Sequence, residues 1–179
     1  MRVLKVFKND IGNGPGIRVS VWCSGCEHAC PECHNQETWA FDQGQELTPE
    51  RIERIVQLCD SAEVAGLTIT GGDPLHPRNE SGTIALARAF KLRFPQKNVW
   101  VWTGYRFEEL LRRGIGGESG VDALRGLVDV LVDGRYNRKL RQVTLPYSGS
   151  SNQRVIDLGR WFATGELAET DVNAHSRII

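Results

Sequence analysis

The chain has 179 residues and carries 22 acidic and 22 basic side chains, so its formal net charge is zero. This balance lacks the broad positive charge that draws proteins to nucleic acid or to anionic membranes. The length suits one domain with a sizeable core, no apolar run approaches the roughly 20 residues of a membrane-spanning helix, and the first eight residues are too charged for a signal peptide. We therefore expect a cytoplasmic protein with no nucleic-acid or membrane partner.

Strand-like and helix-like segments alternate along the chain. The predicted strands are 17–22, 66–70, 98–102, 128–132 and 154–158. Helices are predicted to begin at Thr48, as a cap before Pro49, and to span 84–94, 107–113 and, as a short one, 121–125. This order predicts an α/β fold with a mostly parallel sheet, either an open sheet or a partial (β/α) barrel of about five or six units. Residues 1–165 would form a single domain, and residues 166–179, which lack periodicity, a flexible C-terminal tail.

Polar or glycine-rich motifs follow four of the predicted strands. They are Ser24-Gly25-Cys26, Gly71-Gly72-Asp73-Pro74, Thr103-Gly104-Tyr105 and Asp133-Gly134. In parallel α/β proteins the functional site forms at the carboxyl ends of the strands. We therefore expect these four motifs to share one rim of the sheet.

Four of the five cysteines lie within eleven residues, as Cys23, Cys26, Cys30 and Cys33. In a reducing cytoplasm such a cluster indicates a metal site before it indicates disulfides. All four thiols could form a structural zinc site, whereas the last three form a C-x3-C-x2-C pattern. Three thiolates on a cubane of four irons leave one iron free to bind a cofactor.

Spacing favours the three-cysteine interpretation. Zinc ribbons separate their cysteine pairs by a dozen or more residues, and here only three residues intervene. Strand alternation also places Cys23 on the same face as Val19 and Val21, where a free cysteine serves as a small core residue. The hypothesis is thus a [4Fe–4S] cluster on Cys26, Cys30 and Cys33.

The C-x3-C-x2-C pattern resembles the cluster motif of the radical S-adenosylmethionine (SAM) enzymes. Gly71-Gly72-Asp73 resembles the glycine-rich motif with which those enzymes hold the methionine part of the cofactor, although Gly-Gly-Asp-Pro is also ordinary turn chemistry. Further motifs follow in order: Asn13-Gly14-Pro15-Gly16, Cys33-His34-Asn35, Thr38-Trp39, His76-Pro77, Val101-Trp102-Thr103-Gly104-Tyr105, Val130-Leu131-Val132-Asp133-Gly134 and Gly149-Ser150-Ser151-Asn152-Gln153. Together they resemble the activating proteins of anaerobic (class III) ribonucleoside-triphosphate reductase, over roughly residues 6–158.

The resemblance implies a partial barrel of the radical SAM type and an oxidoreductase activity. One electron from the cluster would cleave SAM, and the resulting radical would take a hydrogen from a backbone glycine of the reductase large subunit, leaving a glycyl radical. An external one-electron reductant would be needed. The cluster ligands would be Cys26, Cys30 and Cys33. The cofactor would be bordered by Glu32, Cys33, His34, Gly71, Gly72 and Asp73.

Two other functions stay open. An activase of another glycyl-radical enzyme, of the pyruvate formate-lyase type, would share the cluster and the glycine motif, although the Trp102–Tyr105 and Gly149–Gln153 stretches argue against it. A zinc-binding interaction module is the alternative that is not an enzyme. Iron and sulfide analysis of anaerobically purified protein separates the zinc module from the activases.

The remaining candidates have simple structural interpretations. We expect His28 to be a solvated loop residue rather than an iron ligand, His76 and His175 to be loop or tail residues, and Cys59 to lie in the core. Trp100 and Trp102 should share one sheet face. Trp39 could cover the cluster or meet a partner. The basic run 135–141 could be a solvated loop or a contact for an acidic patch on a partner protein.

Overall fold

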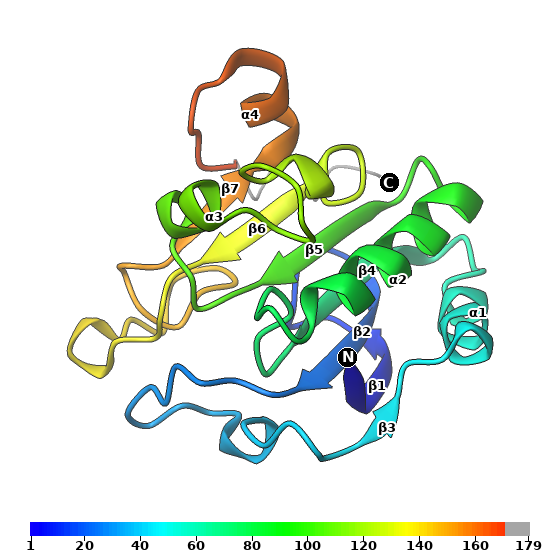
Figure 1. The fold of residues 1–179 in the computed structure, drawn as a ribbon, viewed down its shortest axis with the longest axis horizontal. Coiled ribbons are helices and arrows are strands. Elements are labelled where there is room, and N and C mark those ends of the chain that lie inside the picture. The colour runs from blue at the N-terminus through cyan, green and yellow to red at the C-terminus, as the bar shows by residue number, and fades with distance from the viewer. Residues whose placement is uncertain (171–179) are drawn as a thin grey trace.

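The computed structural model describes residues 1–170 as a seven-stranded sheet with helices packed on one face (Figure 1). The strand order is β3-β1-β2-β4-β5-β6-β7. The strands are β1 (Arg2–Asp10), β2 (Ile17–Ser24), β3 (Gln45–Glu46), β4 (Val64–Gly71), β5 (Asn98–Trp102), β6 (Val130–Asp133) and β7 (Arg154–Asp157). The helices are α1 (Pro49–Leu58), α2 (Glu80–Arg93), α3 (Phe107–Arg113) and α4 (Leu158–Thr164), with short 3-10 turns η1 (Gln36–Thr38), η2 (Asp122–Leu124) and η3 (Arg138–Leu140).

The central strands β2, β4, β5 and β6 are parallel and are joined by crossovers that contain α1, α2 and α3. This confirms the predicted alternation of strands and helices. The cap of α1 is also as predicted, because the Thr48 hydroxyl accepts a hydrogen bond from the Arg51 amide at 3.3 Å. The parallel strands bring the ends of β2, β4, β5 and β6 to one rim.

The outer strands run antiparallel to their neighbours, which corrects the prediction of five or six repeated units. Residues 134–153 join β6 to β7 and contain the short 3-10 turn η3 but no α-helix that could form a crossover. Strand β7 therefore returns beside β6 in the opposite direction. At the other edge, β1 forms a hairpin with β2, and its side chains, of which only Val3 is fully buried, gave no strand signal. The sheet is open, and a partial barrel of the radical SAM type stays a prediction.

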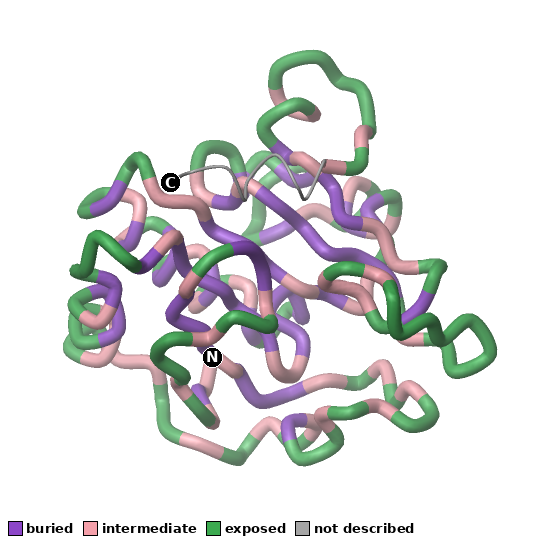
Figure 2. The backbone as a smooth tube through the Cα atoms, turned by 180° about the vertical axis from the view of Figure 1, so that it is seen from behind, coloured by how far each residue is buried: buried purple, intermediate pink, exposed green. Residues whose placement is uncertain are grey.

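One hydrophobic core fills the space between the sheet and the four helices. Alternate residues of the central strands point into it, among them Val19, Val21, Leu67 and Ile69. Cys59 lies in the same core, fully buried, as predicted. Figure 2 shows the backbone from behind, with the central strands largely buried. Trp100 and Trp102 belong to a second, smaller cluster, and their ring centroids lie 5.6 Å apart, which confirms the predicted shared face.

The end of the described chain lies against the sheet. The amide of Thr170 donates to the Val155 carbonyl at 2.8 Å, and the amide of Asp157 donates to the Ala168 carbonyl at 3.0 Å. The beginning of the predicted tail 166–179 is therefore held on β7, while residues 171–179, with His175, lie outside the described residues. Within residues 1–170, no helix has the length and hydrophobicity that crossing a bilayer requires.

A buried ion pair fixes the end of β6, where the rim motif Asp133-Gly134 begins. The Asp133 carboxylate is 1% exposed and accepts hydrogen bonds from Arg154 Nε at 3.0 Å and from the Phe107 amide at 2.7 Å, at the start of α3. Arg154 also reaches Glu108 at 2.8 Å. One carboxylate thus joins β6, β7 and the first turn of α3.

Arg154→Met should therefore destabilise the fold by about 3 kcal/mol, because it leaves a buried carboxylate without its cation. Arg160→Met is the matched control, since the Arg160–Glu166 pair is solvent-exposed and worth under about 1 kcal/mol. Urea unfolding at neutral pH measures both changes. Equal losses of unfolding free energy for the two variants would contradict the assignment of Asp133 as a buried, paired charge.

Candidate functional site

The motifs that follow β2, β4, β5 and β6 meet around one pocket, as the sequence predicted. The pocket has a volume of about 130 Å³ and opens to solvent. Its wall includes Cys26 after β2, Gly72 after β4, Thr103 and Gly104 after β5, and Gly134 after β6. The position of the pocket, at the carboxyl ends of parallel strands, is where ligands and cofactors bind in α/β proteins.

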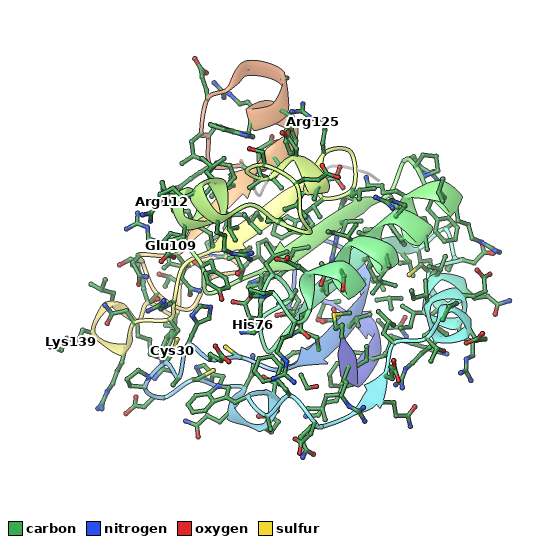
Figure 3. All side chains as sticks on the ribbon, viewed as in Figure 1. Cys30, His76, Glu109, Arg112, Arg125 and Lys139 are labelled. Carbon is green, nitrogen blue, oxygen red and sulfur yellow. The ribbon has the colours of Figure 1, made fainter. Side chains whose placement is uncertain are left out.

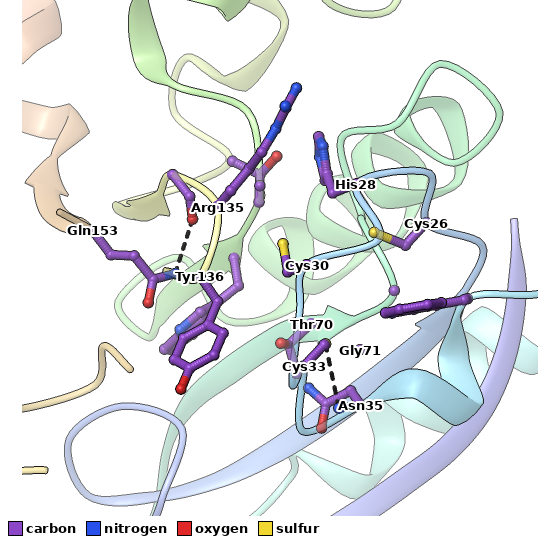
Figure 4. A pocket seen from close by; sticks show the side chains of 16 residues that line it. Cys26, His28, Cys30, Cys33, Asn35, Thr70, Gly71, Arg135, Tyr136 and Gln153 are labelled. Carbon is purple, nitrogen blue, oxygen red and sulfur yellow. Dashed lines mark hydrogen bonds between the residues drawn. The ribbon is translucent and has the colours of Figure 1, made fainter. Parts of the chain in front are cut away.

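The cysteine loop contributes Cys26, Cys30 and Cys33 to the pocket, as Figure 4 shows. All three are partly buried. Backbone hydrogen bonds close the base of the loop, from the Gly25 amide to the Thr38 carbonyl at 2.7 Å and from the Cys26 amide to the Trp39 carbonyl at 3.0 Å. The three thiols are thus presented by one loop that starts and ends at the same point of the sheet.

Cys23 does not reach the pocket. It is fully buried on the core face of β2, as predicted, and its sulfur lies 3.9 Å from the Asn79 amide nitrogen. Within residues 1–170, no three His, Cys, Asp or Glu side chains converge closely enough to hold one metal ion. Cys23 is therefore separated from the three pocket thiols, and the four cysteines do not surround one common point as the ligands of a single zinc ion would.

Burial raises the pKa values of two of the pocket thiols. The pKa of Cys26 rises to about 12, chiefly because the surrounding protein removes water from the thiolate. The pKa of Cys30 rises for the same reason and, to a lesser extent, because Cys33 lies nearby. Without a metal these thiols are protonated at neutral pH, so binding of iron would release protons from them.

Gly71 and Gly72 line the pocket and also touch the backbone of the cysteine segment. Gly71 has a φ of +101°, and a Cβ there would lie 2.6 Å from the Cys23 carbonyl oxygen. A Cβ on Gly72 would lie 2.6 Å from the Gly25 carbonyl oxygen. Only glycine permits this close approach, so the motif sets the distance between the loop after β4 and the cysteine loop. The absence of side chains also leaves the backbone of Gly71 and Gly72 accessible to a ligand.

Asp73, expected to border the cofactor, does not line the pocket. Its side chain is fully buried, and its carboxylate accepts hydrogen bonds from the Leu75 amide at 2.9 Å, the Thr103 hydroxyl at 2.8 Å and the Gly104 amide at 3.0 Å. It also contacts His28 Nε2 at 2.5 Å. The carboxylate therefore joins loops beneath the site instead of facing a ligand.

Glu32 and His34, also expected to border the cofactor, lie outside the pocket wall. The Glu32 carboxylate pairs with Arg138 at 2.7 Å and is half-exposed. The His34 ring contacts Tyr136 edge to face, with 6.0 Å between ring centroids. Of the six residues predicted to border the cofactor, Cys33, Gly71 and Gly72 line this pocket.

The expectation of a solvated His28 is wrong. Its side chain is only 7% exposed and packs between Asp73 and the Tyr105 ring, 4.7 Å away. His76, visible in Figure 3, is also buried, and its Nε2 lies 3.3 Å from Glu27. Loop histidines lack a periodic pattern that would reveal burial, because their partners come from distant segments.

Sequence reasoning named no role at the site for Arg135, Tyr136 and Gln153, which line the pocket opposite the cysteines (Figure 4). Gln153 donates to the Gly134 carbonyl at 2.9 Å and so joins β7 to the loop after β6. The available signals were the place of Gln153 in a motif that resembles the family and the place of Arg135 and Tyr136 directly after another such motif, in the basic run 135–141. Trp39 also lines the pocket, which agrees with its proposed place next to the cluster.

Comparison with known proteins identifies the family. Residues 12–156 match the family described as a 4Fe-4S single cluster domain. The chain is 38% identical over 160 residues to the anaerobic ribonucleoside-triphosphate reductase-activating protein of Salmonella typhi, covering 88% of this chain and 99% of the relative. This protein belongs to that family. The homologue of Escherichia coli K12 is 37% identical over 160 residues, with the same coverage, and that of Enterobacteria phage T4 is 37% identical over 151 residues, 84% of this chain and 90% of the relative.

Membership in the activating-protein family agrees with the site geometry. The matched range runs from the loop before β2 to the end of β7, so it contains the cysteine loop and every strand whose end forms the pocket. The family description names one 4Fe–4S cluster, and the described chain offers one pocket lined by three cysteines. The resemblance inferred from the sequence motifs is thereby confirmed.

Proposed function

We propose that this protein is a radical SAM activase that generates the glycyl radical of an anaerobic ribonucleoside-triphosphate reductase. The observation that carries the proposal is the single pocket on which Cys26, Cys30 and Cys33 converge while Cys23 stays in the core. Relatives that match nearly the whole chain are named as activating proteins of that reductase. The reductase large subunit is therefore the proposed partner and protein substrate.

The proposed ligands of the cluster are Cys26, Cys30 and Cys33, and the SAM cofactor would occupy the rest of the pocket. When bound, the cluster would supply one electron for the reductive cleavage of SAM. Three protein thiolates leave one metal position for the cofactor. An external one-electron reductant is required, since the pocket residues themselves offer no redox group other than the thiols.

Several pocket residues suit SAM by their chemistry. Gly71 and Gly72 allow close approach to backbone groups, and Arg135 is the only lysine or arginine on the described pocket wall, where it can face the cofactor carboxylate. Trp39 and Tyr136 present aromatic rings on which an adenine can stack. In this proposal Glu32, His34 and Asp73 support the surrounding loops, because none of them lines the pocket.

The surface around the pocket would meet the reductase. The basic run 135–141 begins on the pocket wall with Arg135 and continues over the exposed Arg138, which pairs with Glu32, and Lys139. Its two interpretations, a solvated loop and a contact for an acidic patch of the partner, both remain compatible with this position.

Electron paramagnetic resonance tests the proposal. Anaerobically reconstituted, reduced protein is mixed with SAM and the reductase large subunit, and we expect a glycyl-radical signal that requires all of these components. Formation of 5′-deoxyadenosine without the reductase measures cofactor cleavage alone. A radical formed only on pyruvate formate-lyase would move the function to the other activase class. One zinc per chain without iron–sulfur absorbance would contradict the enzyme assignment.

A further inference from the structure

The cysteine loop has an unusual backbone for its sequence. Ala29 has a φ of 47° and Glu32 a φ of 58°, so two residues with side chains adopt the left-handed conformation within the span of the three cysteines. Such residues persist only where surrounding contacts hold them. The loop therefore needs an anchor between Cys26 and Cys30, the stretch where its closing hydrogen bonds to Thr38 and Trp39 do not reach.

His28 provides the buried contact there, whereas the neighbouring Glu27, which contacts His76, is largely exposed. Its Nε2 lies 2.5 Å from Asp73 Oδ2, and both side chains are nearly or fully buried. Every other partner of that carboxylate is a donor, namely two backbone amides and the Thr103 hydroxyl, so the histidine ring also donates. The Thr103 hydroxyl is in turn oriented by the Tyr105 amide, at 3.2 Å.

The ring of His28 also fits a space that Gly104 leaves for it. A Cβ on Gly104 would lie 2.2 Å from His28 Cδ2 and 2.5 Å from Nε2. On its other side the ring meets Tyr105 edge to face, at 4.7 Å. The cysteine loop is thus seated on the ends of β4 and β5 by one histidine, held through a carboxylate and a glycine that belong to neighbouring motifs.

We propose that His28 is a positioning residue that clamps the cysteine loop to Asp73 and Gly104 and so sets where the thiols of Cys26 and Cys30 stand. The effect of His28 on cluster binding rests on the proposed function. The contact of His28 with Asp73 and Gly104 is present in the metal-free protein and does not depend on that function. His28 lies on the pocket wall, and in this proposal it acts on the thiols through the loop and through Asp73, which does not line the pocket.

The first test is hydrogen exchange in the metal-free protein. His28→Leu keeps the volume of the ring but removes the donor, and His28→Gln keeps a donor at a similar reach. We expect backbone amides of residues 26–34 to exchange about 10-fold or more faster in the Leu variant, with protection largely restored in the Gln variant. Unchanged exchange in the Leu variant would overturn the clamp.

Gly104→Ala tests the same contact by changing the residue against which the His28 ring packs. If His28→Leu fails to fold, the Gly104→Ala variant provides the test of the positioning role. The added methyl group should displace the ring and reproduce the fast exchange of the loop. Since both changes break one contact, the double variant should be no worse than either single variant. Gly12→Ala is the control, because a methyl group there meets only Asp10, at 3.6 Å.

The second test uses the protein loaded with iron and sulfide. Transfer of iron to a chelator should be about 10-fold to 100-fold faster in His28→Leu than in wild type, as for other residues that orient metal ligands, with recovery in His28→Gln. The electron paramagnetic resonance spectrum of the reduced Leu variant should be broadened. If the wild-type protein binds no iron, the proposed function is wrong, but the hydrogen-exchange result still tests the contact of His28 with Asp73. If the wild-type protein binds iron and the variants lose it as slowly as the wild type does, the positioning role of His28 is wrong.

Discussion

Serine in place of Cys26, Cys30 or Cys33 is expected to abolish the iron–sulfur absorbance of the reconstituted protein, whereas alanine in place of Cys23 should leave it intact. The physical reason is their separation in space. Three of these thiols line the pocket, and Cys23 is fully buried on the core face of β2. A hydroxyl is a poor substitute for a thiolate on iron, so loss of one pocket thiol should prevent stable assembly of the cluster.

Iron and sulfide content, measured together with the visible absorbance, reports this result. Cys59→Ala is the matched control, because Cys59 is also fully buried but lies at the end of α1, remote from the cysteine loop in the chain. Cys23→Ala and Cys59→Ala should each cost about 1 kcal/mol of stability through lost packing and retain full iron content. Loss of the cluster on Cys23→Ala alone would show that the ligand set includes the fourth cysteine.

Alanine in place of Gly72 should remove most of the SAM cleavage activity. A Cβ at this position would lie 2.6 Å from the Gly25 carbonyl oxygen and 3.0 Å from the Gly25 nitrogen, directly before Cys26. These are backbone atoms, and the same Gly25 carbonyl accepts a hydrogen bond from the Asp73 amide at 2.9 Å. The loop must therefore move as a whole, and a displacement on the order of 1 Å at a reacting centre can cost about 100-fold in rate.

The measurement is the rate of 5′-deoxyadenosine formation in the absence of the reductase, with iron content determined on the same sample. The strain should also lower the unfolding free energy by about 1–3 kcal/mol. Gly12→Ala should leave the rate of 5′-deoxyadenosine formation and the unfolding free energy unchanged, because its added methyl group makes only an ordinary contact. A Gly72→Ala variant with wild-type cleavage would mean that the two loops separate freely and that their close approach has no role.

Burial in the core could be predicted from the sequence wherever periodicity applied. Cys23 alternates with Val19 and Val21, and Cys59 continues the apolar face of α1, so the sequence pattern correctly places both in the core. The direction of β7 could not be predicted, because its residues would suit a parallel strand equally well. The missing crossover helix between β6 and β7 decides it.

The surroundings of the candidate site were harder to predict than the three cysteines that line its pocket. Asp73 was assigned to the cofactor because a carboxylate suits a positively charged ligand, but four donors from three segments surround it. His28 was expected to lie in solvent, because the sequence around it offers no residue that would pair with its ring. Its partners come from 45 and more residues away along the chain, and no local pattern reports such contacts.

The sequence by itself determined the chemistry: three cysteines at cluster spacing, a glycine motif on the next strand, and a set of ordered motifs that the comparison with known activating proteins confirms. These features are local, since thiol spacing and glycine placement are properties of single segments. The tertiary structure alone decided which side chains face the pocket and which face one another beneath it. That distinction depends on how strand ends from four segments meet. It surrounds the Asp73 carboxylate with donors, and it places His28 on the pocket wall between that carboxylate and the Tyr105 ring.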